Sequence, residues 1–336
     1  MTREIAPLAL TMGDPAGCGP QITVSTWRTR QHDTHPFYVI GDPRLYSDYA
    51  PVAPVQTASD AQNAFADALP VFPIELPNFE SLVVGKPDPA FAPTIIASIE
   101  SACRHCLNGD AAGMITNPIS KAVLYESGFS FPGHTEFIAS LCGEKGNPAP
   151  MPVMMLVGGG LRVALATIHV PLLQVLDHLT PNGLSETAMI THSALKQRMG
   201  ISDPKLAFTG LNPHAGENGT IGSEEQDLIN PVAAQLRAKG VDISDARPAD
   251  TVFHEALQGQ FDAIIAMTHD QGLIPVKTLD MWGGVNTTLG LPIIRTSPDH
   301  GTAYEAAASR SCRDDSLRAA LALAAEFAGH EDKTHV

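Results

Sequence analysis

The sequence predicts a mostly parallel α/β fold that contains one antiparallel hairpin, and two observations support this. Apolar runs of strand length alternate with longer segments of helical periodicity along most of the chain, which is the pattern of a parallel sheet covered by helices. Residues 151–168 differ, because two apolar runs flank Gly158, Gly159 and Gly160 there. That arrangement predicts an antiparallel hairpin, which in a parallel layout often marks a second subdomain.

The individual elements follow from residue type and spacing. The expected strands are residues 7–12, 36–42, 113–118, 205–212 and 262–268. The expected helices are residues 93–107, 185–200, 224–240, 249–260 and 316–329. After the first strand, GDPAGCGPQI (13–22) is expected to form a tight turn that opens another helix, with Pro20 near its first turn. Its glycine spacing matches neither the dinucleotide fingerprint nor a Walker loop.

Composition limits the classes of protein that this chain can represent. Its 336 residues are 44% hydrophobic and 17% charged, which allows two globular domains or one large one. A formal charge of −15 with scattered Lys and Arg argues against binding to nucleic acid or to an anionic membrane. No run approaches the length of a membrane span, so a cytoplasmic protein is expected. The pair Cys103 and Cys106 is interpreted as two small side chains one helical turn apart.

Three histidines share one context, since each follows an apolar strand candidate. VALATIH ends at His169, KLAFTGLNPH at His214 and DAIIAMTH at His269. Ligands of open α/β sheets bind beyond the carboxyl ends of the strands, where residues distant in sequence converge. Three imidazoles there predict a divalent-metal site suited to zinc, cobalt, nickel or iron. The alternative is that each histidine only forms a hydrogen bond at its strand end.

Two cations stand among apolar residues in the C-terminal third of the chain. Lys277 and Arg295 would be costly to bury in an acidic protein without an anion beside them. A phosphate or carboxylate ligand is therefore expected, and ordinary salt bridges to Asp280 or Asp299 are the alternative.

The segment FPGHTEF adds a second candidate anion site. It places His134 and Thr135 at an expected helix start, with Thr135 as the cap and free backbone N–H groups nearby. A helix cap with an incidental histidine is the simpler interpretation of this segment by itself.

Taken together, these motifs resemble the 4-hydroxythreonine-4-phosphate dehydrogenase family of pyridoxal phosphate biosynthesis. The resemblance covers nearly the whole chain in order. It is carried by GDPAGCGP, TNPISK, FPGHTEF, the His169 segment, GLNPHAGENG, PADTVF, THDQGLIPVKTL and GVNTTLGLPIIRTSPDHGTAYE.

The resemblance implies a two-domain α/β/α fold like that of isocitrate and isopropylmalate dehydrogenases, with a cleft between the domains. It implies an NAD-binding domain of residues 1–130 plus 285–336, and a metal-binding and dimerisation domain of residues 131–284. The expected assembly is a homodimer whose active site is shared at the subunit interface.

The resemblance also implies roles for individual residues. The expected metal ligands, drawn from both subunits, are His169, His214 and His269. The expected contacts to a phosphorylated substrate are His134, Thr135, Lys277, Asn286 and Arg295. The expected catalytic residues are Lys277, His134 and Asp250, and the expected NAD-binding residues are His300, Gly301, Thr302 and Ala303. The implied cofactors are NAD or NADP and a divalent cation, which is Zn, Co or Mg.

The implied reaction is oxidation of the secondary hydroxyl of 4-phosphooxy-L-threonine, followed by decarboxylation of the 3-keto product. Two departures from the family's usual pattern leave the substrate open: Gln21 replaces a common Glu, and AAASRSCRDD (306–315) replaces a loop that commonly carries glycine. The alternatives are dehydrogenases of 4-phospho-D-threonate, of 4-phospho-D-erythronate or of a dicarboxylated dihydrodiol. A phosphate acyltransferase without NAD and a noncatalytic metabolite sensor represent different classes.

Overall fold

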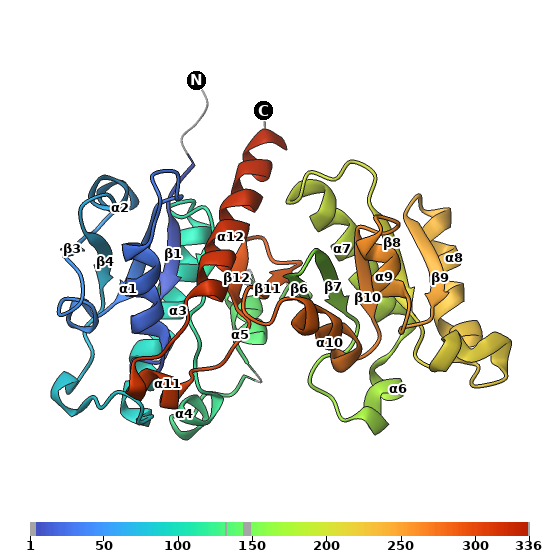
Figure 1. Ribbon diagram of the computed structural model, residues 1–336, viewed down its shortest axis with the longest axis horizontal. Helices are drawn as coiled ribbons and strands as arrows, with labels where there is room; N and C mark the ends of the chain where they lie inside the picture. Colours follow the sequence, from blue (N-terminus) through green and yellow to red (C-terminus); the bar gives the residue numbers. More distant parts are fainter. Residues whose placement is uncertain (1–4, 132, 144–148, 335–336) are drawn as a thin grey trace. The chain divides into compact units, whose positions relative to one another are not determined.

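The computed structural model describes residues 5–131, 133–143 and 149–334 (Figure 1). The chain divides into two compact units: unit 1 comprises Met1–Pro152 with Leu291–Val336, and unit 2 comprises Val153–Gly290. This division differs from the boundaries expected after residues 130 and 284. Residues 133–143 belong to unit 1 because they pack there, as the 3.8 Å separation of the Cys103 and Cys142 sulfurs shows.

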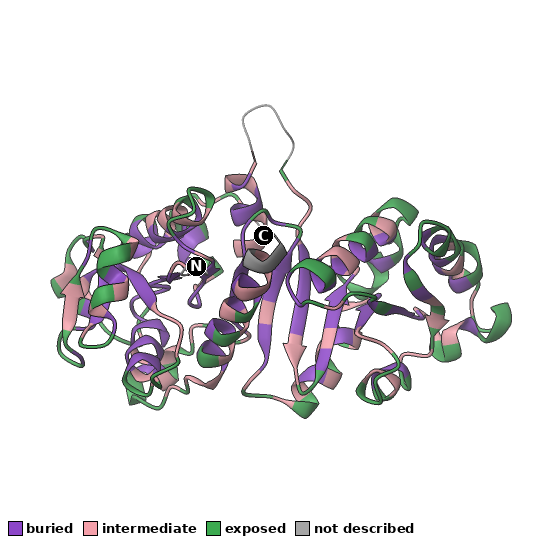
Figure 2. Ribbon diagram, turned by 90° about the horizontal axis from the view of Figure 1, so that it is seen from above, coloured by how far each residue is buried: buried purple, intermediate pink, exposed green. Residues whose placement is uncertain are grey.

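Unit 1 contains a parallel sheet with the strand order β3-β4-β2-β1-β5-β12. Its strands are β1 (Leu8–Thr11), β2 (Phe37–Gly41), β3 (Val52–Pro54), β4 (Leu69–Pro73), β5 (Met114–Ile115) and β12 (Arg295–Pro298). Its helices are α1 (Gly19–Arg28), α2 (Ala58–Ala64), α3 (Ala92–Leu107), α4 (Lys121–Glu126), α5 (His134–Leu141), α11 (Tyr304–Ser309) and α12 (Asp315–Thr334). Figure 2 shows buried residues along the strands and exposed residues on the outer helical faces.

Unit 2 contains a mixed sheet with the strand order β11-β6-β7-β10-β8-β9. Its strands are β6 (Val153–Gly158), β7 (Leu161–Leu165), β8 (Lys205–Thr209), β9 (Asp242–Arg247), β10 (Ala263–Ala266) and β11 (Val285–Leu289). Its helices are α6 (Val175–His178), α7 (Pro181–Gln197), α8 (Asn230–Ala238), α9 (Val252–Leu257) and α10 (His269–Leu279), and a π-helical turn, Glu225–Ile229, precedes α8. β6 is antiparallel to both of its neighbours, whereas the pairs from β7 to β9 are parallel.

The structure confirms the α/β prediction. Each expected strand and helix is present within a few residues, and β6 and β7 form the expected hairpin. Elements that the sequence analysis did not predict include β3, β4, β9, β11, β12 and α10.

The core of unit 2 holds the strands that precede the three histidines. Val163, Ala207 and Ile264 come from three different strands, and each is fully buried. Burying such side chains stabilises the unit by about 25 cal/mol per Å² of apolar surface. The strand ends beyond this core are therefore held firmly, which fixes the backbone from which the site residues extend.

Candidate functional site

Three adjacent parallel strands of unit 2 each lead into one of the singled-out histidines. β10 pairs in parallel with β7 on one side and with β8 on the other, and Figure 1 shows the three side by side. His169 follows β7, His269 follows β10 and His214 follows β8. The three histidines therefore leave the sheet at the same edge, where open α/β sheets bind ligands.

Two of these histidines lie close together. The ring centroids of His169 and His269 are 5.5 Å apart. Nδ1 of His269 lies 2.8 Å from Oδ1 of Asp270. A carboxylate beside one ring nitrogen orients the ring and leaves the other nitrogen, Nε2, to bind a ligand, as in many metal sites. This donor chemistry fits a divalent cation.

The third histidine stands on a strained loop. His214, Ala215, Glu217 and Asn218 all have left-handed φ angles, between 42° and 56°, a conformation that costs energy for residues with a side chain. Among the described residues of this single chain, no group of three His, Cys, Asp or Glu side chains is arranged to hold a metal ion. The three-histidine site therefore stays a prediction.

A buried carboxylate holds the base of that loop. Glu225 is 1% exposed, and its Oε1 accepts hydrogen bonds from the backbone N–H groups of Leu211, at 2.8 Å, and Asn212, at 2.7 Å. Its Oε2 accepts a third from the Asn212 side chain, at 3.0 Å. Glu225 thus fixes the chain just before His214, a role that the sequence analysis missed.

Unit 1 contains a separate cluster of cationic and polar groups. Arg295 is 3% exposed, and its Nη2 donates to Oγ1 of Thr116 at 2.6 Å. Burial lowers the pKa of the Arg295 guanidinium to about 10, and the carboxylate of Glu136 opposes this shift. The guanidinium remains charged at neutral pH, so it offers an anion a dry, cationic partner.

His134 belongs to this cluster. α5 begins at His134 and its N-cap is Gly133, so the expectation that Thr135 caps the helix was wrong. Nε2 of His134 is buried and has no hydrogen-bond partner among the described residues. Burial lowers the pKa of His134 well below 6.5, and the charges of Arg295 and Lys121 lower it further. A neutral imidazole, an unused ring nitrogen and a helix N-terminus together suit an anionic ligand.

The shifted pKa of His134 predicts a loss of stability in acid. The unfolded chain binds a proton at His134 near pH 6.5, whereas the folded chain does not. Unit 1 should therefore lose stability as the pH falls below about 6.5, by at most about 1.4 kcal/mol per pH unit from this group. Replacing His134 with glutamine should reduce that slope. The slope is measured by following Trp27 fluorescence during urea unfolding at several pH values, with Trp282→Phe present in both proteins. An equal slope with His134 and with His134→Gln would contradict the lowered pKa of His134.

Residues 300–303, which are expected to bind NAD, lie against the loop that follows β1. The Cys18 backbone N–H donates to the carbonyl oxygen of Thr302 at 2.8 Å. A Cβ on Gly17 would stand 2.9 Å from the same oxygen, so only glycine allows this approach. Tyr304 donates to Asp14 at 2.6 Å. His300, Gly301 and Ala303 remain exposed, as a ligand-binding segment requires.

The structure distributes the sequence-predicted residues over both units. Unit 1 holds His134, Thr135, Arg295, His300, Gly301, Thr302 and Ala303, and unit 2 holds His169, His214, Asp250, His269, Lys277 and Asn286. Sequence reasoning missed Thr116 and Lys121 as members of the cationic cluster, although both lie in the quoted motif TNPISK.

Comparisons with known proteins give consistent results. The family described as pyridoxal phosphate biosynthetic protein PdxA matches residues 32–324. A 4-hydroxythreonine-4-phosphate dehydrogenase of Maricaulis maris is 47% identical, covering 97% of this chain and 98% of its own. The crystal structure of the Klebsiella pneumoniae enzyme of that name is 33% identical, covers 96% and 99% of the two chains, and has a TM-score of 0.86. A terephthalate 1,2-cis-dihydrodiol dehydrogenase from Burkholderia xenovorans is 28% identical over 96% and 98%, with a TM-score of 0.66.

Proposed function

Because the chain belongs to the PdxA family of pyridoxal phosphate biosynthetic proteins, we propose that it is an NAD-dependent dehydrogenase acting in the cytoplasm. Its substrate is 4-phosphooxy-L-threonine, whose secondary hydroxyl is oxidised and whose 3-keto product is decarboxylated. The observation that carries the proposal is the placement of His169, His214 and His269 after three adjacent parallel strands. NADP is the alternative to NAD as the electron acceptor. Among its described residues, the structure contains no helix that could span a membrane.

The three histidines would hold a divalent cation, which is Zn, Co or Mg. A cation held there would lower the pKa of a bound hydroxyl group, and NAD would accept the hydride from its carbon. Asp270 would orient His269 through the 2.8 Å contact to Nδ1, and Glu225 would fix the His214 loop.

The cationic cluster of unit 1 would bind the phosphate group of the substrate. Arg295 would supply charge and two parallel N–H groups, and Lys121 would add a second charge. His134, which is neutral at pH 7, and Thr135 would donate hydrogen bonds from the start of α5. Phosphate is favoured because buried cations and helix N-termini both suit it.

The proton of the hydroxyl group would pass to one of three side chains, Lys277, His134 or Asp250. Lys277 lies on α10, the helix that begins at His269, and Asp250 precedes α9. Asn286, on β11, would bind the substrate through its amide. Each of the three side chains is able to accept a proton.

A homodimer with a shared site accounts for the exposed apolar side chains of unit 2. Leu172 is 78% exposed and Leu173 97% exposed, shortly after His169. Ile274 and Trp282, on or just after the helix that begins at His269, are 64% and 54% exposed. Large apolar groups exposed in this number are typical of an interaction surface. Ligands drawn from two subunits would also explain why the described residues of one chain hold no complete cluster.

A dihydrodiol dehydrogenase is the second candidate, favoured by the 28% identity to an enzyme of that name. A dicarboxylated diol would also bring anions to the cationic cluster. The dehydrogenases of 4-phospho-D-threonate and 4-phospho-D-erythronate remain candidates, because their substrates would also bring anions to the cationic cluster.

A substrate panel tests these assignments. Purified protein with NAD and Zn, Co or Mg should produce reduced-nicotinamide absorbance from 4-phosphooxy-L-threonine, and EDTA should abolish it. The two phosphorylated sugar acids and the dihydrodiol dicarboxylate serve as competing substrates. NAD at one hundred times its Kd should also raise the free energy of unfolding by about 2.7 kcal/mol. Absence of both turnover and stabilisation by NAD would favour the acyltransferase class instead.

A further inference from the structure

Unit 1 contains a pair of cysteines that none of the roles above uses. The Sγ atoms of Cys103 and Cys142 lie 3.8 Å apart, within reach of a thiol–thiol hydrogen bond. Cys103 lies on α3 and Cys142 is the C-cap of α5, and the two helices pack against each other. The pair therefore joins two helices through residues that are 39 positions apart in the sequence.

The geometry favours Cys142, rather than Cys106, as the partner of Cys103. Cys103 and Cys106 are one turn apart on α3, and neighbours at this spacing have Cβ atoms about 5–6 Å apart. A disulfide needs Cβ atoms about 3.5–4.5 Å apart. A bond between Cys103 and Cys106 would therefore distort α3, whereas the sulfurs of Cys103 and Cys142 already face each other.

The surroundings of Cys103 favour its thiolate, the form that reacts with oxidants. The hydrogen bond with the Cys142 thiol lowers the pKa of Cys103, and the charge of Arg104 lowers it further, while burial opposes both. The same hydrogen bond and burial raise the pKa of Cys142. Cys103 is thus suited to be the attacking sulfur, and Cys142 to be the thiol that resolves its oxidised form.

Burial limits the oxidants that can reach the pair. Cys103 is 1% exposed and Cys142 is 8% exposed. A peptide disulfide is too bulky to approach such sulfurs, whereas hydrogen peroxide is only slightly larger than water. All five cysteines are free thiols, and disulfides that form in reducing compartments are usually transient and redox-sensing.

We propose that Cys103 and Cys142 form a peroxide-sensitive disulfide that ties α5 to α3. The Cys103 thiolate attacks one oxygen of hydrogen peroxide, the O–O bond breaks, and the other oxygen leaves as water with the proton that the Cys103 thiol has lost. The Cys142 thiol then attacks the sulfur of the resulting sulfenic acid. The S–S bond forms, the S–O bond breaks, and the hydroxyl group leaves as a second water with the Cys142 proton. The two thiols lose two electrons in total, and the peroxide gains them.

The disulfide acts on the cationic cluster through α5. An S–S bond is about 2.0 Å long, so closing the 3.8 Å gap draws the C-terminal end of α5 towards α3. His134 stands at the other end of this eight-residue helix and moves with it. This consequence rests on the proposed function, in which His134 binds the phosphate group of the substrate.

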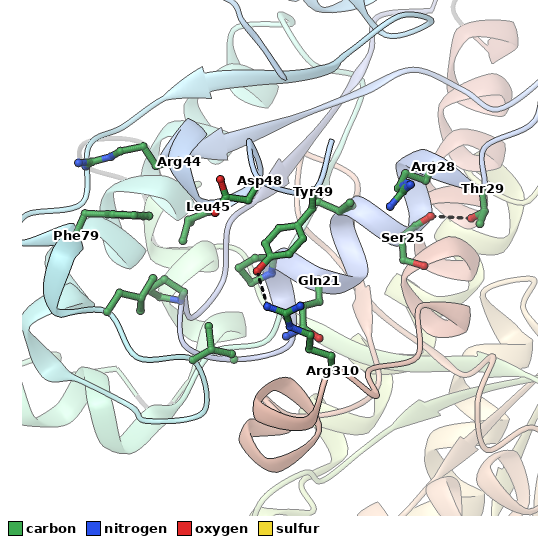
Figure 3. A pocket seen from close by; sticks show the side chains of 16 residues that line it. Gln21, Ser25, Arg28, Thr29, Arg44, Leu45, Asp48, Tyr49, Phe79 and Arg310 are labelled. Carbon is green, nitrogen blue, oxygen red and sulfur yellow. Dashed lines mark hydrogen bonds between the residues drawn. The ribbon is translucent and has the colours of Figure 1, made fainter. Parts of the chain in front are cut away.

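The disulfide should leave other parts of unit 1 largely unchanged. A pocket between α1 and the segment after α11 has Gln21, Tyr49 and Arg310 in its walls (Figure 3), and none of the described residues that line it belongs to α3 or α5. Thr302 is held by the Cys18 backbone N–H of the loop after β1. Oxidation should therefore raise the KM for the phosphorylated substrate and leave the KM for NAD unchanged.

Peptide mapping of the full-length protein tests the disulfide without an activity assay. The protein is treated with hydrogen peroxide, its remaining thiols are alkylated under denaturing conditions, and it is digested with trypsin. Trypsin cleaves after Arg104, so Cys103 and Cys106 fall in different peptides. Mass spectrometry should find the Cys103 peptide linked to the Cys142 peptide, and dithiothreitol should separate them. The Tm of the oxidised protein should exceed that of the reduced protein by about 5 °C or more, because the link restricts the unfolded chain.

Two variants define the pair. Cys142→Ala should abolish both the linked peptides and the rise in Tm. Cys106→Ala, the matched control, removes the neighbouring thiol of α3 and should leave both results intact. Because oxidised and reduced wild-type protein are compared with each other, the test does not depend on the folding of either variant. The proposal is overturned if Cys103 and Cys142 stay reduced or become sulfinic acids without a link, or if Cys106→Ala prevents the link.

Kinetics separates the disulfide from the proposed function. Oxidation should lower kcat/KM for 4-phosphooxy-L-threonine about tenfold in the wild type, because small displacements of binding groups are costly. The same peroxide treatment should leave Cys142→Ala unaffected. An unchanged kcat/KM in fully linked protein would refute the action on the cationic cluster. Linked peptides in a protein without dehydrogenase activity would refute the proposed function and support the disulfide.

Discussion

Replacing His214 with alanine should lower metal-dependent turnover about thousandfold or more. The reason is that the site would lose one of three nitrogen ligands, and charge stabilisation by a bound cation is worth several kcal/mol, where each 1.4 kcal/mol corresponds to about a tenfold change in rate. The affinity for Zn²⁺, measured by calorimetry on the apo protein, should fall in parallel. This second readout does not depend on activity.

The local structure makes His214→Ala a clean test. The side chain is exposed, so its removal leaves no cavity in the core. The loop itself is held by the Glu225 carboxylate through Leu211 and Asn212, which the change does not touch. Alanine also already occupies the next left-handed position, Ala215. The thermal unfolding temperature of the metal-free variant should therefore match that of the metal-free wild type.

His254→Ala is the matched control, because His254 is an exposed histidine of the same unit and lies within α9 rather than after β7, β8 or β10. It should leave turnover and Zn²⁺ affinity unchanged. Full turnover by metal-free His214→Ala would refute the metal assignment.

The position of the three histidines after strand ends could be predicted from the sequence, because a local pattern of residues marks a strand end. An apolar run followed by a polar break indicates a strand end, and parallel strands end at one edge of a sheet. The left-handed loop around His214 could not be predicted in this way. It depends on Glu225, which lies outside the motif and acts through backbone N–H groups.

Helix α10 was missed because its sequence contradicts helix propensity. It contains Gly272 and Pro275, residues that normally weaken or break a helix interior. Tertiary packing explains the glycine: a Cβ at position 272 would collide with the side chain of Leu165 on β7. The helix exists because it packs closely on the sheet, and that contact is invisible in a local window.

Strands β11 and β12 were missed for a different reason. Their sequences, VNTTL and RTSP, are polar, although Thr287 and Thr296 are at most 1% exposed. Buried polar strands lack the apolar run that identifies an interior strand. The cationic cluster was only partly predictable for a related reason, since Arg295 and Thr116 are 179 positions apart in the sequence.

Replacing Arg295 with methionine should reduce kcat/KM for the phosphorylated substrate about hundredfold or more. A hydrogen bond to a charged group contributes about 1.5–3 kcal/mol, and a guanidinium can form two with one phosphate. Methionine is unbranched and fills much of the space of the arginine stem, so packing around the site should be largely kept. Removing a buried cation need not destabilise the protein, because its desolvation cost is removed as well.

The unphosphorylated analogue, 4-hydroxy-L-threonine, separates phosphate binding from other effects of Arg295→Met. The wild-type protein should use it poorly, and the variant should use it about equally poorly, because the interaction that the mutation removes is already absent. With the phosphorylated substrate, the kcat/KM of Arg295→Lys should lie between that of the wild type and that of Arg295→Met. Lysine keeps the charge but lacks the planar pair of donors. An equal loss with both substrates would mean that Arg295 supports the structure of the site, through the 2.6 Å hydrogen bond to Thr116, rather than the phosphate.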